Sequence, residues 1–280
     1  MKLVSYRTSG ADSFGIWRDD GIVDLKGKIA GGGATLRSLL DKLDAVAPFA
    51  ANAPDLAHDA VDLLPPVIDP PKLLCVGLNY KTHIAETGRD APAHPILFPR
   101  YPSSLVGAGE DLVRPKVSHD FDFEGELAFV VGRGGRHISE ADALDHVAGY
   151  ACFNDGSIRD WQRHTTQFMP GKSFWRSGSF GPWLVTPDEV GDLGSLSLTT
   201  RLNGEVMQQA TLDDLLFGVP ALVAYISTIL PLEPGDVVAT GTTGGVGLFR
   251  KPPVWMKPGD RVEVEIEGLG ILSNGIVDEA

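Results

Sequence analysis

Two glutamates two positions apart, Glu124 and Glu126, are the first candidates for chemistry in this sequence of 280 residues. They stand in the segment DFEGELAFVV, whose apolar second half predicts a buried strand. Residues i and i+2 of a strand face the same side, so both carboxylates are expected to point the same way. Two buried carboxylates repel each other unless one is protonated or a cation lies between them. A solvent-facing acidic strip is the commoner fate of such a pair, but the adjoining apolar run favours the mouth of a core strand.

Asp155 is the third carboxylate of interest, because it ends the apolar run of GYACFND and precedes a Gly-Ser turn. From the local sequence alone, a turn-forming role is the better interpretation. Three carboxylates without a Cys or His nearby would suit an oxygen-seeking cation such as Mg²⁺ or Mn²⁺, with Ca²⁺ as a further candidate. Such a site leaves coordination positions open for water and substrate.

Composition excludes several classes of partner. Lysine and arginine number 24 against 37 acidic residues, a formal net charge of −13, which disfavours nucleic acid and anionic membranes as partners. The first residues lack the apolar core of a secretory signal, and no apolar run approaches the roughly 18 residues of a membrane helix. The cytoplasm is therefore the expected location. Cys75 and Cys152 each lie in an apolar run and are expected as buried thiols.

The remaining pattern divides the chain near its Pro-rich segment. Short strands are predicted within residues 2–25, and leucines at helical spacing predict an amphipathic helix over 34–50. Pro65-Pro66 ends a small N-terminal α/β domain, residues 1–66, and residues 67–280 form the second, catalytic domain. That domain is predicted to be mainly β, with strands at 72–80, 126–132, 183–186, 196–204, 236–241 and 261–277 and helices at 140–149 and 213–230. The fold class is therefore α+β, mainly β, without Rossmann or TIM alternation.

A series of motifs between about Lys72 and Val277 resembles the fumarylacetoacetate hydrolase family. The motifs, in the family's order, are CVGLNYKTHIAETG, DFEGELAFVVGR, HVAGYACFNDGSIRDWQ, GKSF with GPWLVT, LNGEVMQ, PGDVVATGT with GGVG, and PGDRVEVEIEGLG. Each motif alone is weakly specific, but the combination is highly specific. The resemblance implies a mixed β-sandwich roll, usually assembled as a homodimer, that performs metal-assisted chemistry on small oxo-acids.

The resemblance also implies roles for individual residues. Glu124, Glu126 and Asp155 fall on the family's metal-ligand positions. His83 and Glu86 match its His-x-x-Glu pair, and their spacing places both on one face of a short helix. A carboxylate beside the imidazole suits a general base that activates water.

Further matches surround this group. Lys172 falls on the family's active-site lysine, where an ammonium would hold an oxyanion or an enolate. The matching positions that are expected to lie close to the substrate are Arg159, Gln162 and Thr242. Arg100 stands where many relatives carry a lysine, and it is expected to bind a carboxylate without readily donating a proton. Trp175, beside Arg176, replaces an acidic position and predicts a pocket unlike those for polyhydroxy sugar acids.

The leading hypothesis from sequence is hydrolytic C–C cleavage of an acylpyruvate or fumarylpyruvate-like β-diketo acid. The intact His83–Glu86 pair favours hydrolysis, because that reaction needs an activated water. Isomerisation of a 2-hydroxymuconate-type acid and decarboxylation remain alternatives, since both use the same metal and enolate chemistry. A non-catalytic metal-stabilised protein is disfavoured because no ligand or dyad residue is missing, and a zinc hydrolase would require His or Cys ligands.

Overall fold

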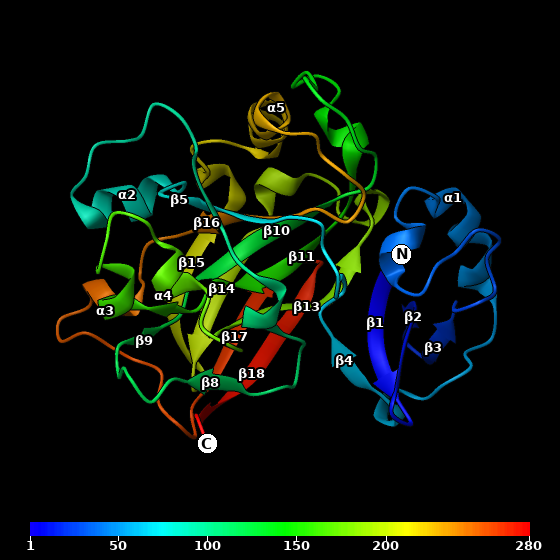
Figure 1. The fold of residues 1–280 in the computed structure, drawn as a ribbon, viewed down its shortest axis with the longest axis horizontal. Helices are drawn as coiled ribbons and strands as arrows, with labels where there is room; N and C mark the ends of the chain where they lie inside the picture. Colours follow the sequence, from blue (N-terminus) through cyan, green and yellow to red (C-terminus); the bar gives the residue numbers. More distant parts are fainter.

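The computed structural model describes residues 1–280, and its centre is an eleven-stranded mixed sheet. The strand order is β3-β2-β1-β13-β11-β10-β16-β5-β6, with β4 beside β1 and β7 beside β13 (Figure 1). The bounds of these strands are β1 (Lys2–Thr8), β2 (Ala11–Arg18), β3 (Gly21–Asp24), β4 (Asp62–Leu64), β5 (Leu73–Gly77), β6 (Ile96–Pro99), β7 (Leu105–Val106), β10 (Gly125–Val131), β11 (Val147–Asn154), β13 (Gly178–Val185) and β16 (Val237–Thr242).

A five-stranded sheet in the order β15-β14-β17-β18-β8 packs against the main sheet. Leu127 and Cys152 of the main sheet share one core cluster with Leu198, Val264 and Leu272 of this second sheet. The bounds of the remaining strands are β8 (Leu112–Arg114), β14 (Ser197–Leu202), β15 (Glu205–Thr211), β17 (Arg261–Ile266), β18 (Gly270–Asp278) and the separate pair β9 (Phe121–Asp122) and β12 (Ser157–Ile158). The mainly β, α+β architecture predicted from the sequence is confirmed.

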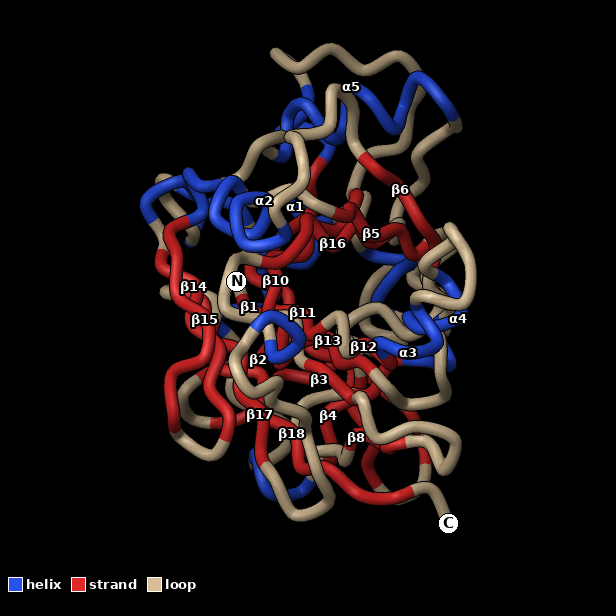
Figure 2. The backbone as a smooth tube through the Cα atoms, turned by 90° about the vertical axis from the view of Figure 1, so that its left-hand side faces the viewer, coloured by secondary structure: helices blue, strands red, loops and turns tan.

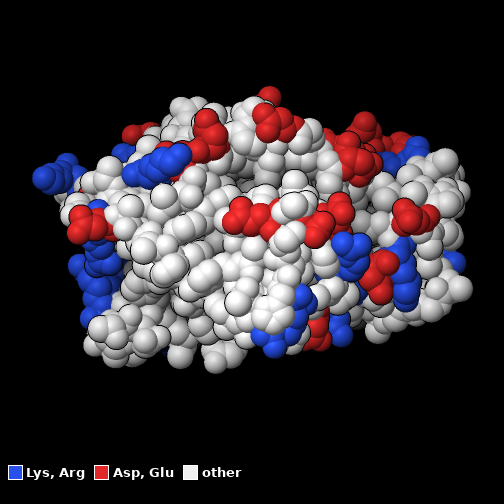
Figure 3. All heavy atoms as spheres, turned by 90° about the horizontal axis from the view of Figure 1, so that it is seen from above, with Lys and Arg blue, Asp and Glu red and all other residues white.

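The helices are short and lie around the periphery of the strands (Figure 2). Their bounds are α1 (Leu43–Val46), α2 (Lys81–Thr87), α3 (Arg159–Gln162), α4 (Met169–Lys172) and α5 (Val219–Ile229). None of them combines the length and apolar character that crossing a bilayer requires. On the face shown in Figure 3, acidic side chains alternate with separate groups of lysine and arginine.

The central strands explain why the main sheet forms. Every residue of β10 and of β11 is buried, as expected for strands that have a neighbour on each edge and are covered on both faces. Cys75 and Cys152 lie within this core as free, buried thiols, as the sequence predicted. The N-terminal strands continue the same sheet, because β1 pairs with β13. The division of the chain after residue 66 stays a prediction.

The amphipathic helix predicted over residues 34–50 is wrong. The segment forms a 3₁₀ turn at Leu36–Leu39, the single turn of α1, and a second 3₁₀ turn at Ala47–Ala51. Leu36, Leu39 and Val46 are nevertheless buried in one cluster, so the leucine spacing identified the buried face. A short isolated helix has little stability of its own, and packing against β1 and β2 decides the backbone instead.

The helix predicted over residues 140–149 is also wrong. Only Ala143–His146 forms a 3₁₀ turn, and Val147 already begins β11. Pairing with strands on both edges and full burial outweigh the local helical signal there. The helix predicted over 213–230 is correct only in its C-terminal part: α5 begins at Val219, with Pro220 in its first turn, where proline is tolerated.

Candidate active site

The ends of four strands meet at one place in the main sheet. β10 runs antiparallel to β11 and to β16, so its first residues lie opposite the last residues of both neighbours. Gly125 pairs with Asn154, and Glu126 pairs with Thr242. β5 runs parallel to β16 and ends at Gly77, so both strands finish at the same end of the sheet. Side chains from distant parts of the sequence therefore converge here.

Glu124, Glu126 and Asp155 are brought together by this register. One oxygen of each carboxylate lies within 4.8 Å of the others, and all three residues are buried. The backbone N–H of Asp155 donates to the Glu124 carbonyl at 2.9 Å, which fixes the turn after β11 against the start of β10. The donor set consists only of carboxylate oxygens, and it therefore fits a hard divalent cation such as Mg²⁺ or Mn²⁺.

Glu126 is the member of this triad that has no ion pair with a lysine or arginine. Its Oε2 accepts a hydrogen bond of 2.9 Å from the backbone N–H of Gly241. Burial, with the neighbouring charges of Asp155 and Glu124, raises the pKa of Glu126 well above its usual value. A bound cation would remove that penalty, which is a second feature of the triad that fits a metal.

Lys172, the last residue of α4, inserts a buried ammonium into the triad. Its Nζ donates to Glu124 Oε2 at 2.5 Å and to Asp155 Oδ2 at 2.6 Å. Burial alone would lower the pKa of Lys172, but the charges of Asp155 and Glu124 outweigh it and raise that pKa. Burial would conversely raise the pKa of Glu124, but Lys172 and Arg159 together lower it to about 2. The ammonium and the Glu124 carboxylate are therefore both charged at neutral pH.

Arg159, the first residue of α3, connects the triad to a fourth buried carboxylate. Its Nε donates to Asp122 Oδ2 at 2.8 Å, its Nη2 lies 2.7 Å from Glu124 Oε1, and its Nη1 donates to Gln162 at 2.9 Å. Asp122 also accepts the backbone N–H groups of residues 247 and 248, at 2.8 and 2.9 Å. The sequence analysis missed Asp122, although the alternation Asp-x-Glu-x-Glu extends to it and was an available signal.

Arg100 requires a correction. It was expected to bind a substrate carboxylate, but its side chain is fully buried and faces Asp155. The guanidinium donates to Asp155 Oδ1, to the Gly156 carbonyl at 3.1 Å, and to the hydroxyls of Ser104 at 3.1 Å and Ser177 at 2.9 Å. All three nitrogens of the guanidinium therefore donate hydrogen bonds within the protein. Arg100 therefore fixes Asp155 from behind and does not reach the cavity.

Helix α2 holds the His83–Glu86 pair above the strand ends. The chain leaves β5 through Leu78, whose φ of +53° lies in the left-handed region that branched side chains rarely adopt. His83 Nδ1 lies 3.2 Å from Glu86 Oε2, and Glu86 Oε1 accepts the backbone N–H of Gly245 at 3.0 Å. Glu86 thereby connects the imidazole to the loop that contains Gly245. Because Nδ1 faces Glu86, Nε2 is the ring nitrogen left to face other groups.

Gln208 of β15 is a second residue that the sequence analysis missed. It is buried, and its Oε1 accepts the backbone N–H of Gly125 at 2.9 Å. Its Nε2 donates to Thr242 Oγ1 and to the Thr243 carbonyl, both at 2.8 Å, and Thr242 Oγ1 donates to the Gly125 carbonyl at 2.9 Å. Gln208 thus holds the backbone between the two glutamates. It lies in the motif LNGEVMQ, but its side-chain contacts cannot be seen in one sequence.

A cavity of about 440 Å³ opens over the triad. All the predicted site residues line it except Glu86 and Arg100, which lie behind His83 and Asp155. The remaining polar lining comes from Thr87, Arg89, Arg163, Thr165 and Thr166, and the apolar lining from Val76, Leu78, Phe98, Phe168, Leu248 and Phe249. The triad is therefore open to a small molecule, and the walls are partly apolar.

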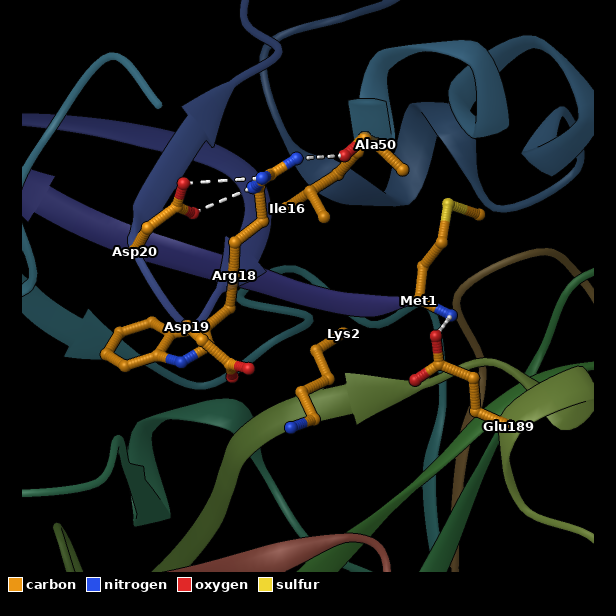
Figure 4. Close-up of a pocket in the computed structure, with 9 residues that line it drawn as sticks. Met1, Lys2, Ile16, Arg18, Asp19, Asp20, Ala50 and Glu189 are labelled. Atoms are coloured by element: carbon orange, nitrogen blue, oxygen red, sulfur yellow. Dashed lines mark hydrogen bonds and ion pairs between the residues drawn. The ribbon is translucent and has the colours of Figure 1, made fainter. Parts of the chain in front are cut away.

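Two further features lie outside this cavity. Trp175 was expected to shape the pocket, but it is 60% exposed, lies beside the Arg176 guanidinium and does not line the cavity. A second hollow, of about 460 Å³, lies by the N-terminal strands (Figure 4). Arg18 and the Met1 amine are already paired there, with Asp20 and Glu189 respectively, each at 2.8 Å, and the Lys2 ammonium lies over the Trp183 ring. It offers no comparable chemical group.

The chain is similar to known proteins both in sequence and in structure. The sequence profile of the family "Fumarylacetoacetate (FAA) hydrolase C-terminal" matches residues 72–277. Oxaloacetate tautomerase fahd2, a mitochondrial protein of Xenopus laevis, is 38% identical over 288 residues, covering 99% of this chain and 90% of that protein. The similarity therefore includes the N-terminal strands.

Two solved structures have the same fold over 100% of both chains. Fumarylacetoacetate hydrolase from the psychrophilic Exiguobacterium antarcticum has a TM-score of 0.84 and 33% identity. Maleylpyruvate hydrolase from Sphingobium sp. SYK-6, solved in complex with manganese(II) and pyruvate, has a TM-score of 0.83 and 27% identity. These relatives are named for more than one class of reaction, tautomerisation and hydrolysis. Similarity alone therefore does not identify the reaction of this chain.

Proposed function

Because the chain belongs to the fumarylacetoacetate hydrolase family, we propose that it is a divalent-metal-dependent enzyme that interconverts the enol and keto forms of a small 2-oxo acid such as oxaloacetate. One observation carries the proposal: a carboxylate triad, a buried ammonium and a histidine meet in one cavity. The oxaloacetate tautomerase of Xenopus, similar over 99% of this chain, supports the choice of substrate.

The proposed reaction moves one proton. The enol loses the proton of its 2-hydroxyl group and carbon 3 gains a proton, so one O–H bond breaks, one C–H bond forms, and the double bond moves from C2=C3 to C2=O. No oxidant, water or second substrate is consumed. The site therefore needs a group that stabilises negative charge on the oxygen and a group that carries a proton near carbon 3.

The oxygen end of the substrate is assigned to the triad. A divalent cation held by Glu124, Glu126 and Asp155 would polarise the 2-oxo group and stabilise negative charge on its oxygen. Lys172 contributes a second positive charge at the same end, and its carboxylate neighbours keep it protonated. Arg159 holds Glu124 from the other side, so that carboxylate keeps its position during the reaction.

The carbon end is assigned to His83. Glu86 fixes Nδ1, and Nε2 is then the atom that delivers or accepts the proton at carbon 3. Phe249 packs edge-on against the imidazole, with ring centroids 6.1 Å apart, and helps to keep bulk water from this part of the cavity. The proton therefore passes between the substrate and one positioned nitrogen.

Hydrolysis of an acylpyruvate is the second candidate, and the same dyad favours it. His83 could take a proton from water instead of from carbon, and the maleylpyruvate hydrolase with the same fold was solved with manganese and pyruvate. Decarboxylation of oxaloacetate needs the charge-stabilising end but no water. It therefore predicts that a His83→Ala variant keeps most of its activity, whereas tautomerisation and hydrolysis both predict a large loss.

One panel separates these reactions. The metal-stripped protein, with and without restored Mn²⁺, is given oxaloacetate in its enol form and an acylpyruvate, and loss of enol absorbance is followed alongside product analysis. Tautomerisation predicts Mn²⁺-dependent loss of oxaloacetate enol without release of pyruvate. His119→Ala, which removes an exposed histidine outside the cavity, is the matched control for His83→Ala. An enol decay that equals the uncatalysed rate would refute the proposal.

A further inference from the structure

We propose that Asp122 is a positioning residue that couples the carboxylate triad to the wall of the cavity over His83. Its single carboxylate holds Arg159, and through it Glu124, while it also holds the 3₁₀ turn Gly247–Phe249. The inference deepens the proposed function and rests on it, because it takes Glu124 as a metal ligand and His83 as the carrier of the proton.

Asp122 ends β9, is fully buried and does not line the cavity. Its carboxylate accepts four hydrogen bonds. Oδ1 accepts the backbone N–H groups of Phe123 at 2.9 Å and Gly247 at 2.8 Å. Oδ2 accepts the backbone N–H of Leu248 at 2.9 Å and Arg159 Nε at 2.8 Å. Donors from separate segments of the chain therefore depend on one side chain.

The turn Gly247–Phe249 depends on Asp122 for its first hydrogen bonds. The residue before the turn supplies no capping side chain, and the first N–H groups of a helical turn have no acceptor within it. Asp122 accepts two of them from 125 residues away in sequence. Leu248 and Phe249 line the cavity, and the Phe249 ring packs edge-on against His83. Asp122 thereby fixes the apolar cover of the imidazole.

Arg159 is the connection to the triad. Its Nη2 lies 2.7 Å from Glu124 Oε1, while its Nε donates to Asp122. The guanidinium is thus shared between two buried carboxylates. Without Asp122, Glu124 would be the only carboxylate paired with Arg159, and the arginine would compete more strongly with a divalent cation for it.

A buried aspartate that accepts backbone N–H groups commonly does no more than stabilise the fold. Asp236 is such a residue in this chain. It is fully buried, accepts the backbone N–H of Glu233 at 2.8 Å, lies 3.1 Å from the Lys72 ammonium and does not line the cavity. Asp122 differs because its partners contact the triad and the histidine. Asp236→Asn is therefore the matched control for Asp122→Asn.

Asp122→Asn keeps the size of the side chain but removes its charge and one of its two acceptor oxygens. Calorimetry should show that the variant binds Mn²⁺ about tenfold more weakly than the wild type. With Mn²⁺ saturating each protein, kcat for the enol reaction should fall about 10- to 100-fold. Asp236→Asn should lower Tm and leave both Mn²⁺ affinity and kcat unchanged.

A double-mutant cycle with Phe249→Ala separates the two connections. The effect on kcat passes through the turn to the Phe249 ring, so Asp122→Asn should cost less than about threefold in kcat once that ring is absent. The effect on Mn²⁺ affinity passes through Arg159 and should persist at about tenfold in the same background.

Hydrogen exchange measures the coupling without the reaction. In the wild type, replacing EDTA by Mn²⁺ should slow exchange in a peptide covering residues 246–250 about fivefold or more, as followed by mass spectrometry. The same exchange in Asp122→Asn should not respond to Mn²⁺.

The outcomes keep this inference separate from the proposed function. If Asp122→Asn loses only Tm, as the control does, or if Mn²⁺ does not slow exchange in the wild type, the coupling is overturned. The second result decides even where the variant does not fold. A loss of kcat that is equally large with and without the Phe249 ring would overturn the connection through the turn. If the wild type does not catalyse the enol reaction, the proposed function fails, while Mn²⁺ affinity and hydrogen exchange still decide the coupling.

Discussion

Replacing Lys172 by methionine tests whether its ammonium neutralises the triad when no metal is bound. Methionine keeps much of the length of the side chain but removes the charge. The ammonium donates to Glu124 at 2.5 Å and to Asp155 at 2.6 Å, and all three groups are buried. In the variant, both carboxylates lose one cationic partner and keep only Arg159 and Arg100.

The magnitude follows from that geometry. Removing one partner of a buried ion pair typically costs about 3–5 kcal/mol of unfolding free energy. At about 2.1 cal/mol/K per residue, the unfolding entropy of a chain of this length is roughly 0.6 kcal/mol/K, so Tm should fall by about 5–8 °C in EDTA. Saturating Mn²⁺ would place a new cation beside both carboxylates, so the difference from the wild type should then shrink by at least half.

Thermal unfolding of the two proteins in EDTA and in Mn²⁺ measures both effects. Lys172→Arg keeps a cation at the position, and Lys257→Met removes an exposed lysine elsewhere, so the first should be milder and the second near neutral. The reasoning is refuted if Lys172→Met unfolds within about one degree of the wild type in EDTA. It is equally refuted if Mn²⁺ stabilises the variant no more than it stabilises the wild type.

Three other perturbations give distinct outcomes. In the metal-free protein the pKa of Glu126 is raised. The difference in unfolding free energy between the wild type and Glu126→Gln should therefore favour the wild type most below the ordinary glutamate pKa of about 4.3, and this advantage should decline as pH rises toward the raised pKa. Urea unfolding in EDTA across that pH range measures the difference, and an advantage that grows with pH would contradict the assignment. Glu86→Gln removes the negative charge beside His83 and leaves one acceptor oxygen in place of the two that contact His83 Nδ1 and the backbone N–H of Gly245. It should lower kcat for the enol reaction about 10- to 100-fold while Mn²⁺ affinity stays the same, and an unchanged kcat would show that the dyad is not needed. Gln208→Leu removes the side-chain oxygen that accepts the backbone N–H of Gly125, between the two glutamates. Mn²⁺ binding measured by calorimetry should weaken about tenfold or more, and an undiminished affinity would show that the strand holds the ligands unaided.

The sequence predicted eight of the twenty residues that line the cavity, including the whole carboxylate triad, because strand alternation and family motifs do not depend on tertiary detail. Glu124 and Glu126 follow from a period of two, and Asp155 from a motif in fixed order. The position of Arg100 could not be predicted, since it depends on how the chain turns after β6 to place the guanidinium beneath Asp155.

Local helical signals failed where tertiary contacts were strongest. Residues 140–149 have helix start and stop signals at Ser139 and Gly149, yet Val147 begins a strand with neighbours on both edges. The contacts of Asp122 and Gln208 cross between distant elements and become visible only in the fold. A single sequence contains the residue types for these contacts but not the distances between them.

Glu124, Glu126 and Asp155 are proposed to hold the divalent cation on which activity depends. Anomalous X-ray scattering from crystals soaked in Mn²⁺ tests it most directly. We expect one strong anomalous peak per chain within bonding distance of all three carboxylates, and the loss of this peak in Glu126→Gln crystals treated in the same way. A triad that stays free of manganese while Lys172 continues to bridge Glu124 and Asp155, or a peak elsewhere in the chain, would contradict it.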